Sequence, residues 1–424
     1  MNLTRRHVLG LTSSIAAAAT LAACGTNTGG LGSSSPSASG SKPTLSQWYH
    51  EYGEDGVQEA VKRYAAAYPD ATVNVQWNPG DYGKLLSAAL LTPNVPDVFE
   101  VEQGGSLDMI KAGQLADLTD IMSPVAAQFN PAVLKRFTFQ DKVHGIPQTI
   151  DMQLLYYRPS LLAKANLQPP RTFAELVAAA KAMKTSAMGG FFAGNDGGIG
   201  VLSNMLVWAS GNEQLNADRT AVGFLSQSFY DAVVAYRDFF ASGDLLQTAS
   251  AEWYTPTPFV NGETAMQWGG LWSLPDIKKA FGDDVGVLPF PAIGASGRAA
   301  VPFGAFGACV AAKGAHVDAA KAFVKWLWID QEDYQVDFSN SYGTHIPAKT
   351  ALVAKADKLA TGAGADAAKF VAENGFASDI MWSGALGDAF GAAVTKVVKD
   401  KADPKTEFEA VGARAVEELK RING

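Results

Sequence analysis

The sequence has 424 residues, a formal net charge of −8 at neutral pH and 47% hydrophobic residues. A chain of this length is long for one hydrophobic core, so we expect two domains. Its acidic balance argues against a nucleic acid partner. Beyond the N-terminal leader, no apolar run is long enough to cross a membrane without a charge, glycine or proline.

Residues 1–23 have the pattern of an export leader. Arg5 and Arg6 supply a positively charged start, and an alanine-rich apolar run follows them. The run ends in Leu-Ala-Ala-Cys, which resembles a bacterial lipobox, so we expect Cys24 to become the lipid-modified first residue of the mature protein. The paired arginines favour export by the Tat route, although Sec leaders also carry them. The alternative is a cytosolic protein with an apolar N-terminal helix.

A flexible tether is expected to follow the leader. Residues 24–43 are rich in glycine and serine and have almost no apolar side chains, so they cannot bury enough surface to fold. About 20 such residues span on average about 25 Å, which holds a globular body just off a membrane. If Cys24 is lipidated, Cys309 has no disulfide partner, and its small apolar neighbours indicate a buried structural thiol.

The first part of the body alternates strands with helices. Strands are predicted at 44–50, 72–77 and 97–101, with amphipathic helices that begin near Val57 and Tyr82. This order predicts a parallel sheet covered by helices on both faces, with ligands bound beyond the carboxyl ends of the strands. The residues at those carboxyl ends are Tyr49, His50, Glu51, Asp81, Tyr82, Glu102 and Gln103. Each of these residues, taken alone, is equally compatible with a solvated loop.

A second α/β unit is predicted further along the chain. Residues 143–158 are apolar and extended and contain Asp151, and an acid inside a buried strand must be paired or face a cleft. Thr172 and Glu175 form the pattern of a capping box that opens a helix. Trp208 and Trp253 are expected in loops of this unit.

A strand at 264–268, a sharp bend at the glycine pair 269–270 and a loop that carries Trp272 are predicted next. A helix that starts near Ser273 would place backbone N–H groups beside this indole. A flat apolar face beside hydrogen-bond donors suits a sugar. The alternative is that Trp268 and Trp272 are both core aromatics.

The remaining predicted elements are expected to contribute side chains to the packed core. They are a strand at 285–291, a glycine- and proline-rich crossing at 298–304 into another apolar strand, a helix through 320–327 and a terminal helix that starts at Asp403 and Pro404.

Sequence motifs for catalysis and cofactor binding are absent. The sequence contains no H-E-x-x-H, C-x-x-C, G-x-S-x-G or Walker-type loop. Its histidines lack metal-ligand spacing, so we expect no cofactor and no metal. The glycine-rich run at 194–200 has no clear strand before it and is weak evidence for a nucleotide loop. An acid pair for glycoside hydrolysis stays open among Glu51, Glu102, Asp151 and Asp196.

Short stretches spread over nearly the whole body match one known family in their order and spacing, although no single stretch is specific. They are 94–98 with 112–118, 145–147 with 155–158, 170–176, 259–266 with Gly270 and Trp272, and 288–291. In this pattern the chain resembles the extracellular solute-binding proteins of carbohydrate ABC importers, the maltose-binding-protein-like group.

The resemblance implies an α/β, two-lobed, type II periplasmic-binding-protein-like fold with the ligand cleft between the lobes. The expected parts are an N-lobe at 44–149, a C-lobe at 150–300, a return to the N-lobe at 301–346 and C-lobe helices at 347–424. Crossings between the lobes are expected near 147–152, 298–304 and 344–349, where a hinge would let the lobes close on a ligand.

The resemblance also implies a function. We expect a monomeric, lipid-anchored receptor, not an enzyme, that binds a mono- or oligosaccharide and delivers it to the permease subunits of an ABC importer. The alternatives are a secreted carbohydrate hydrolase and a receptor for a non-sugar solute. The expected binding residues are Tyr49, His50, Glu51, Tyr82, Glu102, Gln103, Asp151, Trp208, Trp253, Trp268, Gly270, Trp272, Phe303, Phe306, Tyr342 and Trp382.

The resemblance supports two of these residues as ligand contacts, and a third residue differs from the pattern of the family. The aromatic residue of the family's Gly-x-Trp segment commonly stacks on the sugar ring, which favours Trp272, and Asp151 matches a position that often faces the cleft. Phe306 stands where many relatives have adjacent glycines, so we expect it to narrow the cleft.

Overall fold

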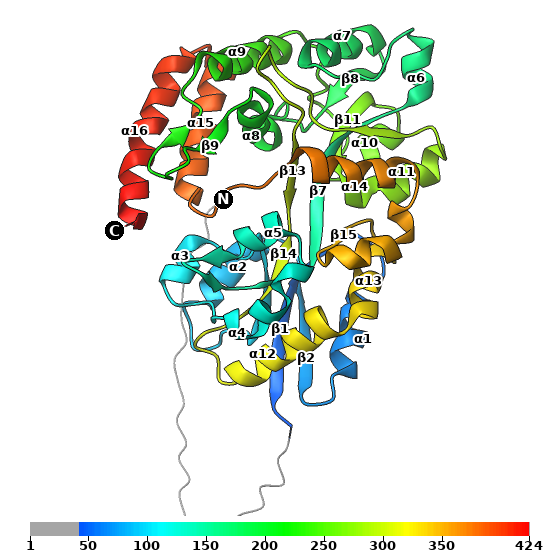
Figure 1. Ribbon diagram of the computed structural model, residues 1–424. Helices are drawn as coiled ribbons and strands as arrows, with labels where there is room; N and C mark the ends of the chain where they lie inside the picture. The colour runs from blue at the N-terminus through cyan, green and yellow to red at the C-terminus, as the bar shows by residue number, and fades with distance from the viewer. Residues whose placement is uncertain (1–41, 424) are drawn as a thin grey trace, which may run out of the picture. The chain divides into compact units, whose positions relative to one another are not determined.

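The computed structural model describes residues 42–423, so the predicted leader, Cys24 and nearly all of the predicted tether lie outside the described residues. Two sheets organise the described chain: a five-stranded sheet in the order β2-β1-β3-β14-β6 and a seven-stranded sheet centred on β7. They define two α/β lobes, called here the N-lobe and the C-lobe, and β7 and β13 run between them (Figure 1). The predicted two-lobed α/β fold is confirmed.

The N-lobe sheet contains the three parallel strands that the sequence predicts, although β2 extends one residue further and β3 is shifted by one residue. β1 pairs in parallel with β2 and β3, and β14 pairs in antiparallel register with β3 and β6. The carboxyl ends of β1, β2 and β3 therefore lie at one edge of the sheet. The strands are β1 (Thr44–His50), β2 (Thr72–Asn78), β3 (Val98–Glu102), β6 (Ile146–Pro147) and β14 (Phe306–Val310).

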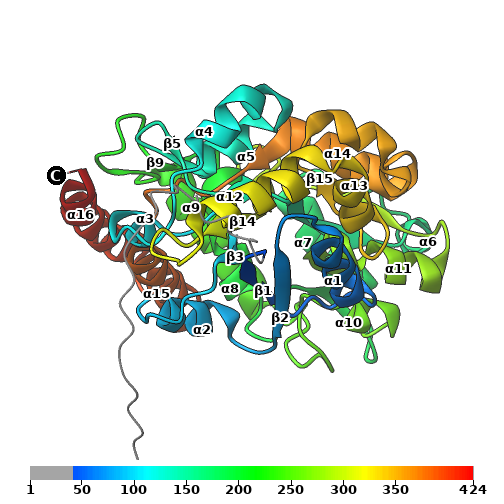
Figure 2. The ribbon, with the colours of Figure 1, turned by 90° about the horizontal axis from the view of Figure 1, so that it is seen from below.

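Helices cover both faces of this sheet, because alternate strand side chains point to opposite faces. Leu45 and Tyr49 pack with α1 and α12, whereas Phe99 and Cys309 pack with α2. Figure 2 shows α2 and α12 on opposite sides of the strands. The N-lobe helices are α1 (Val57–Ala67), α2 (Tyr82–Ala89), α3 (Leu107–Lys111), α4 (Thr119–Met122), η1 (Ser123–Gln128), α5 (Pro131–Arg136), α12 (Val317–Lys325), the π-helical η3 (Trp326–Asp330) and α13 (Glu332–Asn340).

Phe137, directly after α5, sits in a socket formed by three glycines. A Cβ added at Gly104, Gly145 or Gly307 would approach the Phe137 ring to 2.5, 3.0 or 1.9 Å, respectively. These glycines come from the turn after β3, the segment before β6 and strand β14. The buried ring therefore fixes the end of α5, and with it the neighbouring residue Arg136, against the edge of the sheet.

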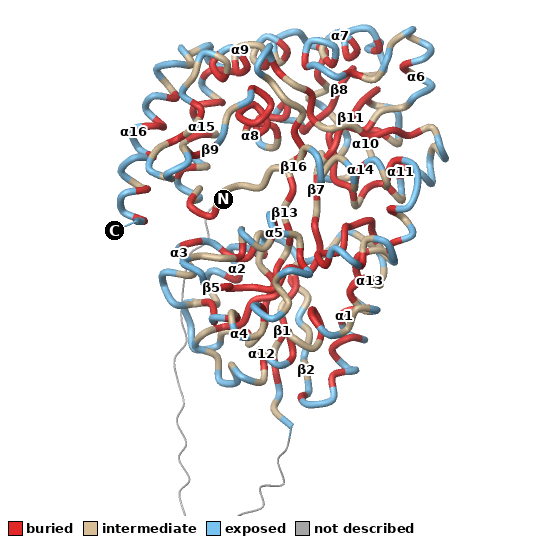
Figure 3. The backbone as a smooth tube through the Cα atoms, in the orientation of Figure 1, coloured by how far each residue is buried: buried red, intermediate tan, exposed pale blue. Residues whose placement is uncertain are grey.

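The C-lobe sheet is built on β7 (Thr149–Tyr157), which pairs with β11, β12, β13 and β15 along its nine residues. Buried backbone in this lobe follows β7, β11 and α8, whereas the outer side of α16 is exposed (Figure 3). The other strands of the sheet are β8 (Gly189–Phe192), β11 (Thr264–Gly270), β12 (Gly286–Leu288), β13 (Val301–Gly304), β15 (Ile346–Pro347) and β16 (Gly375–Phe376).

The C-lobe helices surround this sheet and pack on one another through α8, α9, α15 and α16. They are α6 (Pro159–Lys164), α7 (Phe173–Met183), α8 (Ile199–Ala209), α9 (Gln227–Ala241), α10 (Thr257–Val260), η2 (Leu271–Ser273), α11 (Leu274–Phe281), η4 (Thr350–Lys355), η5 (Asp357–Leu359), α14 (Gly362–Asn374), α15 (Gly384–Asp400) and α16 (Pro404–Asn423). Two small hairpins, β4 (Thr138–Phe139) with β5 (Lys142–Val143) and β9 (Glu213–Leu215) with β10 (Val222–Gly223), complete the fold.

Local capping and packing predictions are confirmed. The Thr172 side chain accepts a hydrogen bond from the backbone N–H of Glu175, whose carboxylate accepts one in return from the Thr172 N–H. The Asp403 carboxylate accepts a hydrogen bond of 2.8 Å from the Thr406 N–H at the start of α16. The Cys309 thiol is fully buried in β14, as its apolar neighbours predicted.

Two local predictions are wrong. Trp208 lies in helix α8 and not in a loop, because residues 199–209 are nearly all apolar and pack into the C-lobe core. The glycine pair 269–270 does not bend the chain, because it continues β11 by pairing with Leu154 and Gln153 of β7. The chain turns only afterwards, in η2.

Within residues 42–423, no helix combines the length and the apolar composition needed to cross a membrane. The same residues contain no cluster of three or more side chains suited to hold a metal ion.

We predict that Gly307→Ala lowers the free energy of unfolding by about 1–3 kcal/mol, the usual scale of overpacking. The reason is that a Cβ at this position and the Phe137 ring cannot occupy the same space. Denaturant unfolding measures the change, and Gly53→Ala is the matched control, because nothing lies within 4 Å of a Cβ added there. Equal stability of the two variants would show that the socket is not tight.

Candidate functional site

A cavity of about 580 Å³ lies between the lobes, where β3 ends and β7 begins its pairing with the C-lobe. Its volume is in the range of small-molecule binding sites. Both lobes contribute to its walls. The principal side chains are Glu102, Gln103 and Phe306 from the N-lobe, and Asp151, Gln153, Asn204, Met205, Trp208, Trp253, Trp272, Phe303, Phe376 and Ser378 from the C-lobe and its connecting strands.

Strand β7 supplies two polar side chains to the cavity. Asp151 and Gln153 are two residues apart, so they share one face of the strand, and both line the cavity. Their cross-strand partners are both glycines, since Gly304 pairs with Asp151 and Gly270 pairs with Gln153. Residues directly opposite on neighbouring strands have adjacent side chains, so a glycine there leaves space beside each polar group.

The space over Gly270 is filled by the indole of Trp272. A Cβ added at Gly270 would stand 2.2 Å from this ring, so the glycine makes room for the indole. The Trp272 Nε1 donates a hydrogen bond of 3.0 Å to the carbonyl oxygen of Tyr254, which orients the ring. Trp253 lies next to it, with ring centroids 6.4 Å apart and an interplanar angle of 60°. The two half-buried indoles form a corner in the cavity wall, called here the indole corner.

The space over Gly304 is occupied by Gln103, since a Cβ added at Gly304 would lie 3.3 Å from its side chain. Gln103 has a φ of 57°, a left-handed conformation that is uncommon outside glycine, and its N–H donates a 2.7 Å hydrogen bond to the carbonyl oxygen of Ala305. Its Oε1 is buried and has no hydrogen-bond partner among residues 42–423. Strained backbone and a free buried acceptor are typical of a binding site.

The cavity is acidic. Glu102 has an exposed side chain, but it faces the cavity, whose walls remove much of its hydration. This desolvation, followed by repulsion from Asp151, raises the pKa of the Glu102 carboxyl above its ordinary value. The described lining residues include these two carboxylates and no basic side chain.

His345 connects Asp151 to the N-lobe. Its Nδ1 contacts the Asp151 carboxylate, and its Nε2 lies 2.9 Å from the Glu54 carboxylate. The His345 side chain is only 7% exposed. Burial lowers its pKa, but Asp151 and Glu54 together outweigh burial and raise the pKa of His345 to about 10. The imidazole is therefore charged at neutral pH and holds the Asp151 carboxylate in one orientation.

Helix α8 presents one side to the cavity. Gly200, Asn204 and Trp208 line it at a spacing of four residues, which places them on one helical face. Trp208 is 3% exposed and stacks on Phe376 with ring centroids 5.5 Å apart, so it forms a wall. Asn204 Oδ1 accepts a 3.1 Å hydrogen bond from Gln214, which orients the amide.

The glycine-rich run at 194–200 precedes α8 and does follow a strand, β8, which the sequence pattern had not revealed because it is only four residues long. The Asp196 carboxylate accepts hydrogen bonds of 2.8 and 2.6 Å from the N–H groups of Gly198 and Gly200. A carboxylate thus already occupies the helix start where nucleotide phosphates would bind. This geometry does not support a nucleotide loop. The Asp196 carboxylate instead caps the start of α8 by accepting hydrogen bonds from backbone N–H groups.

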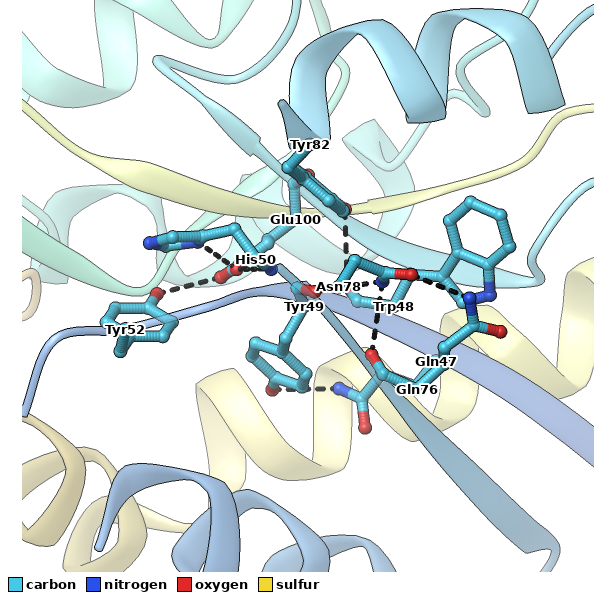
Figure 4. A network of polar contacts seen from close by, with 9 residues as sticks. All are labelled: Gln47, Trp48, Tyr49, His50, Tyr52, Gln76, Asn78, Tyr82 and Glu100. Atoms are coloured by element: carbon cyan, nitrogen blue, oxygen red, sulfur yellow. Dashed lines mark hydrogen bonds and ion pairs between the residues drawn. The ribbon is translucent and has the colours of Figure 1, made fainter. Parts of the chain in front are cut away.

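Three residues of the predicted site, Tyr49, His50 and Tyr82, form polar contacts with other residues of the N-lobe, as Figure 4 shows. The backbone N–H and Nδ1 of His50 contact the Glu100 carboxylate, whose other oxygen accepts a 2.8 Å hydrogen bond from the Tyr52 hydroxyl. The Tyr82 hydroxyl donates a 2.9 Å hydrogen bond to the Glu100 carbonyl oxygen. Tyr49 is 1% exposed and accepts a hydrogen bond from Gln47. None of the three belongs to the described cavity lining.

Other predicted residues support the cavity or lie away from it. The His50 ring stacks on the Phe306 ring with centroids 4.3 Å apart, so it supports a side chain that lines the cavity. Trp268 is fully buried, and its Nε1 donates a 2.9 Å hydrogen bond to Gln153, which orients that amide toward the site. Glu51 is exposed outside the cavity. The Tyr342 hydroxyl accepts a hydrogen bond from Arg63 on the N-lobe surface. Trp382 packs edge-on against Phe224 and Phe390.

Sequence reasoning missed Gln153, Asn204, Met205, Phe376 and Ser378. Gln153 was detectable, because it lies two residues after Asp151 on a predicted strand. Asn204 is a polar residue in an apolar helical run, four residues before Trp208, and a helical interpretation of that run would have found it. Phe376 and Ser378 carry no local signal, because only the tertiary fold brings them to the cavity.

We predict that His345 makes stability depend on pH. Its folded-state pKa of about 10 lies above the ordinary value of 6.5, so its contribution is fully present below pH 6.5 and is lost as the pH rises toward 10. Over this range the free energy of unfolding of the wild type should fall relative to that of His345→Gln, by at most about 1.4 kcal/mol per pH unit. The exposed His316, replaced by glutamine, is the control. Parallel pH profiles for wild type and His345→Gln would contradict the prediction.

Comparison with known proteins identifies the family. The sequence profile of the bacterial extracellular solute-binding proteins matches residues 50–328. The sn-glycerol-3-phosphate-binding periplasmic protein UgpB of Escherichia coli (strain K12) is 26% identical over 272 residues, which cover 59% of this chain and 61% of UgpB. The chain thus matches about three fifths of the length of that relative.

Two further proteins agree in sequence or in fold. The maltodextrin-binding protein MdxE of Bacillus subtilis (strain 168) is 25% identical over 359 residues, 80% of this chain and 79% of MdxE. The GacH receptor of Streptomyces glaucescens GLA.O, solved unliganded and in complex with acarbose, has the same fold, with a TM-score of 0.74 at 22% identity over 90% of this chain and 99% of GacH. The profile match confirms the family that the sequence resembles: this chain belongs to the bacterial extracellular solute-binding proteins.

Proposed function

We propose that this chain is the substrate-binding component of an ABC importer and binds a carbohydrate in the cavity between its lobes. The observation that carries the proposal is the indole corner, where Trp253 and Trp272 share one cavity with the carboxylate of Asp151 and the amide of Gln153. A sugar has apolar C–H faces and a rim of hydroxyl groups. Flat aromatic faces beside several hydrogen-bonding groups match both features.

The polar groups of the cavity are suited to hydroxyl donors. The Asp151 carboxylate, held by His345, and the free Oε1 of Gln103 accept hydrogen bonds from sugar hydroxyls. An unpaired buried acceptor is unfavourable, so a ligand that supplies its donor gains affinity and one that lacks it is rejected.

The charge of the cavity argues for an uncharged sugar ring at the indole corner. Glu102 would repel an anionic group placed beside it, and no basic residue of the described lining offsets this repulsion, whereas His345 balances the charge of Asp151. UgpB is named for a phosphate ester and MdxE for a maltodextrin, so the family accommodates both chemistries. At this corner the lining favours the maltodextrin type of ligand.

We further propose that the lobes have the boundaries predicted from the sequence and close on the ligand by a hinge. The chain passes from one sheet to the other between β6 and β7 and between β13 and β14, and β15 pairs with the start of β7. A few backbone torsions in such passages absorb a rotation while each sheet keeps its pairing. A ligand that contacts both lobes then stabilises the closed form, and a permease distinguishes it from the empty form. Small-angle scattering at saturation would show the closure as a smaller radius of gyration.

We predict that Trp272→Ala weakens carbohydrate binding by about 1–3 kcal/mol, because the flat face of the indole corner is lost. A thermal-shift screen of a sugar library first identifies the ligand, and calorimetry then measures its affinity. Trp382→Ala is the control, because Trp382 packs into the C-lobe outside the cavity and its loss should lower stability and leave affinity unchanged. Unchanged affinity in Trp272→Ala together with a large fall in Tm would assign this indole to the core.

The hydrolase alternative is tested with the same ligand. A raised pKa at Glu102 beside a carboxylate at Asp151 is a pattern that also occurs in glycosidases, so hydrolysis is the second candidate function. A binding protein returns its sugar unchanged after prolonged incubation. Recovery of shorter products, abolished in Glu102→Gln, would overturn the receptor assignment.

We also propose that the protein is a monomer, is exported by the Tat route and is anchored by a lipid on Cys24. The support is the sequence pattern of the leader together with a family whose members are extracellular.

We predict that Cys24→Ser moves the protein from the membrane fraction to the soluble fraction, because the lipid attachment site is lost. Ligand affinity should stay the same, because the cavity is formed by residues far along the chain. Fractionation followed by immunoblotting measures the change, with Ser35→Ala as the control. Membrane association of the Cys24→Ser protein equal to that of the wild type would contradict lipidation.

A further inference from the structure

The space between the lobes does not end at the indole-lined cavity. A second space of about 420 Å³ shares the Trp208 wall with it, and a third of about 180 Å³ shares Phe303, Phe376 and Ser378 with it. The walls of the main cavity therefore continue directly into the walls of the two smaller spaces.

Basic side chains distinguish these two spaces from the main cavity. Lys135 and Arg219 line both of them, and Arg136 lines the smaller one. We call the two spaces, defined by Lys135, Arg136 and Arg219, the basic compartment. Lys135 and Arg136 come from the end of α5 in the N-lobe, whereas Arg219 comes from the turn between β9 and β10 in the C-lobe. Both lobes thus contribute cations.

Arg136 is the unusual member of this set. Its Nη1 donates a 3.3 Å hydrogen bond to the carbonyl oxygen of Gly105, and its Nε is buried without a hydrogen-bond partner among the described residues. Within residues 42–423 it forms no ion pair with a carboxylate. Desolvation lowers the pKa of Arg136 to about 10, against the opposing influence of Asp379 and Glu102, so it stays charged at neutral pH. A desolvated cation without a carboxylate counter-ion is costly, and it is typical of a group that awaits an anion.

Two acids also line the basic compartment, Asp379 in both spaces and Glu213 in the larger one, and both are already engaged. Asp379 pairs with Arg219 at 3.0 Å and accepts a 2.9 Å hydrogen bond from the Met381 N–H. Glu213 pairs with Arg298 outside the compartment. Lys135 is exposed and has no ion-pair partner within the described part of the chain. The unpaired charges in the basic compartment are therefore the positive ones of Lys135 and Arg136, whereas the unpaired charge of the described lining of the main cavity is the negative one of Glu102.

We propose that the ligand is an acidic carbohydrate, with a sugar ring at the indole corner and a carboxylate or phosphate group in the basic compartment. This inference rests on the proposed function and names the substrate class for the same cleft. The two ends orient the ligand, because the unpaired Glu102 carboxylate repels the acidic group from the indole corner while Arg136 and Lys135 bind it. Arg136 supplies the planar donor pair that carboxylates and phosphates both accept.

An interlobe ion pair is the competing role for Arg136. On closure, its guanidinium would approach Asp379 from the opposite side of the cleft, and the cation would then serve every ligand equally. The two roles differ in one measurable respect. A closing contact supports neutral and acidic ligands alike, whereas an anion site supports only the acidic ones.

The test is calorimetry with matched ligand pairs on the full chain. The pairs are digalacturonic acid with galactobiose, maltose 6′-phosphate with maltose, and glucose 6-phosphate with glucose. In at least one pair the acidic member should bind about tenfold or more tightly than its neutral partner, the scale of one charge-assisted hydrogen bond. The pair that responds distinguishes a carboxylate from a phosphate. The preference should shrink at high salt, because Lys135 is exposed.

The double variant Lys135→Gln, Arg136→Gln should lose the preference for the acidic member and keep the affinity for the neutral one. Arg136→Lys should retain part of the preference, and the exposed Lys62→Gln should retain all of it. Melting curves exclude unfolded variants from the comparison. Equal affinities within every pair, or equal losses for both members in the double variant, would overturn the inference and leave the proposed function intact. Binding of no carbohydrate in the wider sugar library would overturn the proposed function itself.

Discussion

The main-chain pairing of β7 is the interaction on which the rest of the structure depends. This strand begins against β15 and β13 and ends against β11 and β12, so one register fixes all four neighbours. A slip of one residue would turn Asp151 and Gln153 to the opposite face and remove both from the cavity. The pairing is itself secured by the buried apolar residues that alternate with them, Met152 and Leu154.

Glycines shape the site as much as the larger residues do, because they leave space for neighbouring side chains. Gly270 and Gly304 lie opposite the two polar residues of β7, and the space that they leave is used by Trp272 and Gln103. The three glycines around Phe137 act in the same way on the N-lobe side. A methyl group at Gly270 or Gly307 would overlap the neighbouring aromatic ring, whereas one at Gly304 would require Gln103 to shift by a few tenths of an ångström.

The sequence predicts the elements well where the signal is local. Strand alternation, the capping box at Thr172 and the helix start at Asp403 depend on neighbouring residues, and the structure has them. Asp151 was recognisable because an acid interrupts an apolar strand. Tyr49, Trp268 and Tyr82 carry the same local signals as cavity residues, and their burial is decided by strand parity and by hydrogen bonds to distant partners. The basic compartment has no sequence signal, because α5 and the β9–β10 turn meet only in the fold.

The isolation of Cys309 has a practical consequence for observing this protein in solution. It is the only cysteine in residues 42–424, it is fully buried, and burial raises the pKa of its thiol to about 12, so labelling reagents that attack thiolates will not reach it. Two cysteines introduced on the surface, one in each lobe, can therefore carry a fluorescent donor and acceptor without removal of Cys309. Energy transfer between the dyes would then report the distance between the lobes in single molecules, one ligand-binding event at a time.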